Sequence, residues 1–160
     1  MCLAILDWES LDHSESPSKP IEYPTEEGIG WKIVFAEDNE HFRNAFASGQ
    51  VLEYNKWVET IDPPMNSQSP HYKLGFHIFI DEKDAKWALS EHYHGPKGRK
   101  QAIVVRVHYK HVLAKGKTYI QNSDTQSMDG YLPTIVAKFM AIEHPPVVCQ
   151  CCGQLLPKVA

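Results

Sequence analysis

The chain lacks several features that would place it in a specialised class of protein. It has no excess of basic residues, because 16 Lys and Arg stand against 20 Asp and Glu, for a formal charge of −4. General nucleic-acid binders carry a basic footprint, so we expect no general nucleic-acid binding. No apolar run approaches the roughly 18 residues of a membrane span. The first ten residues, MCLAILDWES, also lack the basic segment of a secretory signal. We therefore expect a cytoplasmic protein with no membrane contact.

Cysteine is also scarce, and its placement is more informative than its number. Three of the four cysteines lie close together near the C-terminus, which is unlike the disulfide framework of a secreted protein. Cys149-x-x-Cys152-Gly is half of a zinc knuckle, because thiolates at this spacing can share one tetrahedral zinc. Zinc at Cys149 and Cys152 is therefore one hypothesis, and free thiols or a regulatory disulfide are the alternatives. The missing ligands would come from a second chain or from this one: Cys2, His13, His144 or Cys151.

What the chain does contain is the composition of an ordinary globular protein. It has 160 residues, of which 42% are hydrophobic and 22% charged, as expected for one domain with its own core. Residues 9–27 are rich in Ser, Pro, Glu and Lys and show no periodicity. We therefore divide the chain into an N-terminal strand and arm (1–27), a core domain (28–143) and a Cys-rich tail (144–160).

Several segments of the core have the pattern of short strands. Residues 31–35 (WKIVF) predict a buried strand, and residues 51–54 and 57–60 predict a hairpin about Asn55-Lys56. Residues 132–142 predict a last core strand, and residues 115–130 predict a polar loop. Together with one or two short helices, these strands predict an α+β fold: a single compact domain with a mainly antiparallel sheet.

The stretch KLGFHIFIDEKDAKWAL (73–89) predicts a strand followed by a helix. Apolar residues alternate through 74–80 with period two, which puts His77 on the opposite face from Phe76 and Ile78. Asp81 is a good N-cap for the helix that follows. The bland interpretation of His77 is a half-exposed strand histidine, and the functional one is a residue of a ligand-binding cleft.

Residues 101–113 (QAIVVRVHYKHVL) give the strongest strand pattern in the chain. Ile103, Val105, Val107 and Tyr109 fall on one face, and Val104, Arg106, His108 and Lys110 fall on the other. If this strand pairs with the strand of His77, we expect one polar surface that suits an anionic ligand such as a phosphate or a nucleotide. The candidate ligand-binding residues are His77, Arg106, His108 and Lys110.

A basic loop follows the predicted helix. In HGPKGRK (94–100), the side chains of Lys97, Arg99 and Lys100 could reach over a phosphate, although the spacing is not that of a nucleotide P-loop. Just before it, His92 and His94 could chelate a metal on an extended segment, with His71, His77 or His108 as third ligand. The alternative for both segments is a solvated charged loop.

The order of these motifs resembles a set of small phage-borne and bacterial proteins of unassigned function. Its members carry a G-[FIL]-H-x-[FC] strand, a short helix and a run of valines, which correspond here to GFHIF, DEKDAKWAL and AIVVRVH within residues 28–143. This resemblance implies a compact α+β domain and a phage origin, and it implies no known reaction.

A more distant resemblance is to the ADP-ribosyltransferase superfamily, through the strand–helix shape of GFHIFIDEKDAKWAL. The resemblance implies an NAD-dependent enzyme with a polar residue, usually Arg or His, on its first strand and a catalytic Glu on a late strand. This sequence departs from that pattern, because its first core strand offers only Lys32 and its late strand only Glu143.

The function we expect is that of a non-enzymatic binding protein, in one version a phage inhibitor that captures a host protein or a nucleotide-type anionic ligand. An ADP-ribosyltransferase-like enzyme and a zinc-stabilised interaction module are the alternatives.

Overall fold

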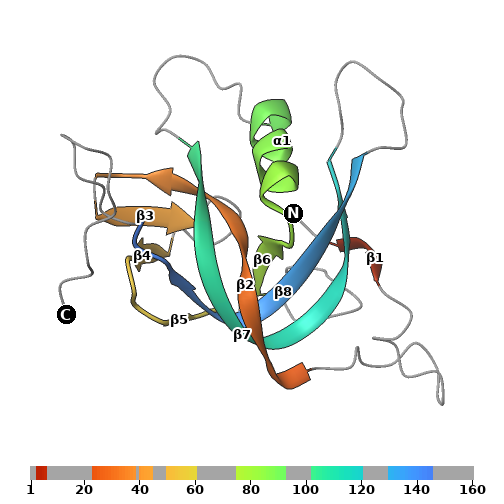
Figure 1. Cartoon of the computed structure of the whole chain (residues 1–160), viewed down its shortest axis with the longest axis horizontal. Helices are drawn as coiled ribbons and strands as arrows, with labels where there is room; N and C mark the ends of the chain where they lie inside the picture. Colours follow the sequence, from red (N-terminus) through yellow and green to blue (C-terminus); the bar gives the residue numbers. More distant parts are fainter. Residues whose placement is uncertain are drawn as a thin grey trace, which may run out of the picture.

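A computed structural model describes residues 3–6, 23–38, 40–44, 50–60, 75–92, 102–120 and 130–145. Its elements confirm the predicted α+β fold with a mainly antiparallel sheet (Figure 1). In chain order they are β1 (Leu3–Leu6), β2 (Tyr23–Ala36), β3 (His41–Asn44), β4 (Val51–Glu53), β5 (Val58–Glu59), β6 (Phe76–Phe79), α1 (Glu82–His92), β7 (Ala102–Tyr119) and β8 (Tyr131–Ile142).

The sheet closes on itself. Its strands follow the order β1-β7-β8-β6-β2-β3-β4, and β7 also pairs with β2. Because β7 has β8 on one side and β2 on the other, the strands β2, β7, β8 and β6 form a closed antiparallel ring. Closure of this kind removes the unpaired edges of an open sheet. The longest strand of the described residues, β7, curves strongly around the middle of the molecule (Figure 1).

The main core is enclosed by the sheet. It is built from alternate residues of the ring strands together with one residue each from β3 and β4, as period-two alternation requires. The faces predicted for residues 103–109 are confirmed, because Val105, Val107 and Tyr109 are core residues and Ile103 packs against them. The other buried members are Val34, Phe42, Leu52, Phe76, Ile78, Val112, Ile135, Ala137, Met140 and Ile142.

Gly30 allows β2 and β6 to approach each other closely. A Cβ atom at this position would lie 2.5 Å from Cγ2 of Ile78 and 2.8 Å from the carbonyl oxygen of Phe79. Neither distance is compatible with a real side chain. The residue next to Gly30, Trp31, makes the register pair with Phe79 that joins the two strands. The ring therefore closes where β2 has no side chain.

Helix α1 covers a second, smaller core. The helix begins as predicted at Asp81, whose Oδ1 accepts a hydrogen bond from the amide of Lys83 (3.1 Å), as an N-cap does. Ala85 and Ala88 are fully buried against Ile33, Phe79, Ile120 and Leu132. Helix α1 has 11 residues and is the one helix in the described part of the chain. No helix of the described residues is long and apolar enough to cross a membrane.

The β7–β8 pair bends sharply at one place. Tyr109 and Val112 both belong to the main core, so two successive residues between them are turned away from it. One of the two is His111, whose φ of 56° lies in the left-handed region that a non-glycine residue rarely adopts. A register shift follows between Val112 and Ala114. Irregularities of this kind are how a strand turns a corner.

Three expectations about the elements were wrong. Residues 51–54 and 57–60 do not pair as a hairpin, because β4 pairs with β3 and β5 pairs with β8. Part of the 115–130 segment is strand, since β7 continues to Tyr119. The predicted N-terminal arm ends earlier than residue 27, since β2 begins at Tyr23. In each case pairing with a strand elsewhere in the chain overrides what the local sequence pattern predicts.

Candidate functional site

His77 is not part of an exposed cleft. Its side chain lies on the face of β6 opposite Phe76 and Ile78, as predicted, but that face is covered and only 5% of the residue is exposed. Burial, and then the positive charge of Lys32, lower the pKa of His77 to about 3. The imidazole is therefore neutral at physiological pH, and His77 cannot contact a ligand at the surface.

The expected polar surface between β6 and β7 does not form. Strand β6 pairs with β8 and β2, so each of these strands separates it from β7. The prediction that His77 lies beside Arg106 and His108 is therefore wrong, because it assumed that the two strands are neighbours.

Lys32 lies inside the main core. It shares a face of β2 with the core residue Val34, and only 1% of it is exposed. Its ammonium donates a hydrogen bond to the carbonyl oxygen of His77 (3.1 Å) and lies 5.7 Å from the centre of the Phe76 ring. Burial lowers the pKa of Lys32 to about 7. The one polar residue that the first core strand offers for reading NAD is thus directed away from solvent.

Arg106, His108 and Lys110 lie together on the outer face of β7. Their alternation with the buried Val105, Val107 and Tyr109 is the one expected from the sequence. The side chains of Arg106 and His108 are 46% and 45% exposed. Three of the seven predicted ligand-binding residues therefore form one accessible line of polar groups.

Glu143, immediately after β8, joins this line. Its backbone amide bonds to the carbonyl oxygen of Arg106 (2.9 Å), which continues the β7–β8 ladder by one residue. Nη1 of Arg106 lies 3.3 Å from Oε1 and 3.1 Å from Oε2, and Nε2 of His108 lies 3.3 Å from Oε2. Oε2 is buried and neither side chain is aligned to hydrogen-bond it. The carboxylate thus holds Arg106 through its charge and through the hydrogen bond to Oε1, and it lies within contact distance of the His108 imidazole.

Two aromatic rings lie at the other end of the line. The ammonium of Lys110 is 4.4 Å from the centre of the Trp57 ring and 5.3 Å from that of Phe139. Both separations are within the range of cation–π attraction. Trp57 is 49% exposed, which is unusual for a tryptophan that serves only packing. Lys110 is therefore held against an aromatic surface that remains open to a partner.

The bend of β7 adds further groups beside Phe139. The imidazole of His111 lies 6.4 Å from the Phe139 ring centre, and the ammonium of Lys138 lies 5.2 Å from it. Lys138 is also paired with Glu59 (3.0 Å). We use "β7 face" below for the surface formed by Arg106, His108, Lys110, Trp57, Phe139 and Glu143.

Sequence reasoning missed three members of the β7 face, of which Phe139 was expected only as part of the last core strand. Trp57 was expected to be an ordinary residue of a hairpin, and Glu143 was considered only as a catalytic residue. The signal for Glu143 was its place immediately after a core strand, where it extends the ladder. Trp57 had no comparable signal, because its position depends on the pairing of β5 with β8.

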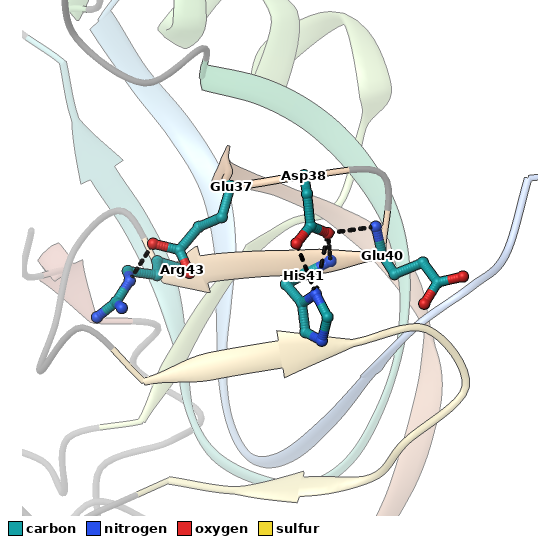
Figure 2. Close-up of polar contacts among 5 residues, drawn as sticks. All are labelled: Glu37, Asp38, Glu40, His41 and Arg43. Atoms are coloured by element: carbon teal, nitrogen blue, oxygen red, sulfur yellow. Dashed lines mark hydrogen bonds and ion pairs between the residues drawn. The ribbon is translucent and has the colours of Figure 1, made fainter.

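A separate polar cluster forms the turn between β2 and β3 (Figure 2). Oδ1 of Asp38 accepts hydrogen bonds from the amides of Glu40 and His41, both at 2.8 Å, and Nδ1 of His41 lies 2.8 Å from Oδ2. The amide of Glu40, followed by the His41 side chain, lowers the pKa of Asp38, and the Asp38 carboxylate raises the pKa of His41. Bonds to successive amides are typical of an Asp that forms a turn. Arg43 and Glu37 form an ion pair beside it.

The remaining predicted site residues lie outside the described residues. These are Lys97, Arg99 and Lys100 of the basic loop, and Cys149 and Cys152 of the tail. Within the described ranges no three His, Cys, Asp or Glu residues gather in a way that could hold a metal ion. Zinc at the tail cysteines stays a prediction.

Comparison of the chain with protein-family models, curated proteins and solved structures gave no match.

Proposed function

We propose that this chain is a binding protein that captures a protein partner through the β7 face. The observation that carries the proposal is the half-exposed Trp57 ring, held against Lys110 on the same surface as Arg106. Tryptophan and arginine are the residues that most often dominate the energy of protein–protein binding. A phage protein that blocks a host factor is the version favoured by the resemblance in sequence.

Pre-organised side chains also support a partner of defined shape. Arg106 is already oriented by Glu143, and Lys110 already rests on Trp57 and Phe139. Side chains that are held before binding lose less conformational entropy when a partner arrives. Strand β7 beneath them belongs to the closed ring and is paired on both sides, with β2 and with β8.

A protein partner fits the β7 face better than a nucleotide does. Two carboxylates near the face neutralise cations, since Glu143 pairs with Arg106 and Glu59 pairs with Lys138. A phosphate would have to compete with these carboxylates. A protein interface tolerates such internal pairs, since its polar groups surround an apolar centre.

The proposal is tested by comparing two matched double variants with the native chain. The variant Trp57→Ala/Arg106→Ala removes one aromatic ring and one cation of the β7 face. The control, Tyr119→Ala/Lys117→Ala, removes an exposed aromatic and an exposed cation from the far end of β7. Each chain is purified under mild conditions from the expressing bacterium, and co-purifying proteins are quantified by mass spectrometry.

We expect a partner that accompanies the native chain and the control but is lost from the β7-face variant. With the partner purified, calorimetry should show binding at least about tenfold weaker for Trp57→Ala/Arg106→Ala. Equal retention of every partner by both variants would contradict the proposal. If a nucleotide raises the melting temperature of the native chain but not that of Arg106→Ala, the ligand of the β7 face is a small anion and not a protein.

The zinc module and the NAD-dependent enzyme stay predictions with direct tests. Native mass spectrometry of untagged protein, purified without chelators, would show one zinc that Cys149→Ser/Cys152→Ser loses. Incubation with labelled NAD and a cell lysate would show a labelled product for the enzyme, and Glu143→Gln should abolish it.

A further inference from the structure

Three residues of the β7 face form a column along the strand. Arg106, His108 and Lys110 occupy successive positions on one side of a strand, so each is roughly 6.6–6.8 Å from the next along β7. All three can donate hydrogen bonds from their side chains, provided that an imidazole nitrogen of His108 carries a proton. The column is therefore a ladder of donors with the spacing of alternate strand residues.

The strands on either side supply the borders of this column. On β2, the register partners of Arg106, His108 and Lys110 are Trp31, Ile29 and Glu27. On the β8 side, the corresponding partners are Glu143, Ala141 and Phe139. The borders are thus apolar or aromatic except at two diagonally opposite corners, where the carboxylates lie.

A second copy of the chain does not fit the column. If two copies packed face to face about a two-fold axis along β7 or across it, the central strand of one copy would lie on that of the other. Arg106 and Lys110 would then meet arginine and lysine of the second copy, and like charges in contact are unfavourable. The column instead favours an occupant that brings hydrogen-bond acceptors, such as carboxylates, opposite these donors.

We infer that the occupant is an extended polypeptide segment that lies along β7 and carries carboxylate side chains at alternate positions. This inference rests on the proposed function and names the part of the partner that is recognised. In an extended segment, residues i, i+2 and i+4 point to one side at the spacing of the column. Each carboxylate would face one donor, while Ile29 on one side and Trp57 on the other border the segment.

Arg106 can accept such a carboxylate beside Glu143. The contact with Glu143 uses the single nitrogen Nη1, and a guanidinium carries five donors in a fork suited to carboxylates. Oε2 of Glu143, which has no aligned hydrogen bond, does not compete strongly for that geometry. A partner carboxylate therefore completes the coordination of Arg106.

A nucleic acid strand fits less well, although its phosphates repeat at a similar spacing. Glu27 borders Lys110, and Glu59 and Glu143 pair with the other two cations near the column. With three carboxylates close to Arg106, Lys110 and Lys138, the surface offers discrete donors but no excess of positive charge, and the binding of a continuous polyanion depends on such an excess. Discrete carboxylates can avoid the acidic corners, but a continuous polyanion cannot.

The inference is tested with synthetic probes on the full chain. A fluorescein-labelled peptide of five Glu-Thr repeats presents carboxylates at alternate positions. A peptide of the same composition with its glutamates in one block tests spacing, and a ten-residue oligothymidylate tests a polyanion. Fluorescence anisotropy is measured for the native chain, for Arg106→Gln/Lys110→Gln and for Lys83→Gln/Lys86→Gln, which removes the same charge from α1.

We expect the alternating peptide to bind the native chain at least about fivefold more tightly than the block peptide. Binding should weaken at least about tenfold in the β7 variant and change little in the α1 variant. Equal binding of the two peptides, no binding of the alternating peptide, or tighter binding of the oligothymidylate would overturn the inference. If the partner captured through Trp57 and Arg106 still binds in any of these cases, the proposed function stands without it. If the peptide binds as expected but no partner depends on those residues, the proposed function fails instead.

Discussion

Lys32 is the residue whose environment departs most from what its chemistry favours. Its ammonium is fully buried in the main core, where it bonds to the carbonyl oxygen of His77. An ammonium in such surroundings loses its hydration, and this loss is why the pKa falls to about 7 from an ordinary value near 10.5. The titration of Lys32 therefore makes the free energy of unfolding of the whole chain depend on pH.

We predict that Lys32→Met stabilises the chain at pH 6, by roughly 1–4 kcal/mol in the free energy of unfolding. Between about pH 7 and 10.5 the unfolded chain holds a proton on Lys32 that the folded chain has released. The stability of the native chain thus rises with pH across this window and is lowest below it. Urea denaturation at pH 6 and at pH 10 measures the difference.

The gain from Lys32→Met should shrink at pH 10, because the native chain has by then regained stability with the loss of the buried charge, whereas methionine does not titrate. An equal effect of the substitution at both pH values would contradict this account. His77 makes the free energy of unfolding depend on pH in the acidic range as well, because its pKa of about 3 lies below the ordinary value of 6.5. Stability should therefore fall again as the pH drops from 6.5 toward 3.

His41 provides a test of local electrostatics at the protein surface. Asp38 raises the pKa of His41, so the pair stabilises the β2–β3 turn fully below about pH 6.5 and loses this effect as the pH rises through the folded pKa. At the acid end, the contribution disappears as the pH falls through the lowered pKa of Asp38.

We predict that a proton NMR titration finds the pKa of His41 above that of a free histidine. Asp38→Asn should lower it toward the ordinary value, because the charged acceptor is gone. Glu40→Gln should have a much smaller effect, since Glu40 is the weakest of the neighbours that raise this pKa. High salt should weaken the elevation, because both groups are exposed. An unchanged pKa in Asp38→Asn would rule out the pair as its cause.

At the residue scale, the sequence predicts well which face of a strand a side chain lies on. It predicts poorly which other elements cover that face. The alternation along residues 103–110 correctly separates core side chains from the line of Arg106, His108 and Lys110. The same reasoning puts His77 on the right face of β6 and still fails, because a period of two does not say what covers that face. Whether a polar strand residue is exposed depends on elements that are distant in the sequence.

At the scale of elements, ring closure depends on the contact of β2 with β6. We predict that Gly30→Ala destabilises the chain by roughly 1–3 kcal/mol, the usual cost of adding a methyl group where a core has no room. The methyl would meet Ile78 and the backbone of Phe79. Strand propensity alone predicts the opposite sign, since alanine loses less entropy than glycine. Chemical denaturation measures the change.

Ile29→Ala is the comparison for Gly30→Ala, because Ile29 is the preceding residue and lies on the exposed face. Its effect on the free energy of unfolding should be smaller. If Gly30→Ala proves neutral or stabilising, β2 and β6 do not approach each other as closely as described.

The element predictions succeeded where local pattern and tertiary pairing agree. The strand–cap–helix unit that contains Asp81 is local, and its sequence was sufficient to predict it. The hairpin predicted for residues 51–60 was wrong because each of its halves pairs with a different strand, β3 or β8. The bend of β7 at His111 could not be predicted, because no glycine marks the left-handed position.

At the scale of the whole molecule, neither half of the chain contains a complete set of strand partners. β2 pairs with β7 over ten register positions, and β6 pairs with β8. We predict that a fragment of residues 1–92 does not fold, because β6 would keep only its single register pair with β2. A dispersed amide spectrum from this fragment would contradict the prediction, and the full chain is the control.

The closed ring also has a consequence for how the chain reaches its native state during synthesis. Residues of β2 meet partners in β7 that lie 67 to 89 positions later in the sequence, from Phe35↔Ala102 to Tyr23↔Val112, and a ribosome adds about 5–20 residues per second. For several seconds after β2 has left the ribosome, β7, which will pair with its edge, has not yet been synthesised. An apolar strand waiting in that condition is exposed to aggregation. The yield of native protein should therefore increase when translation is faster or when chaperones are abundant.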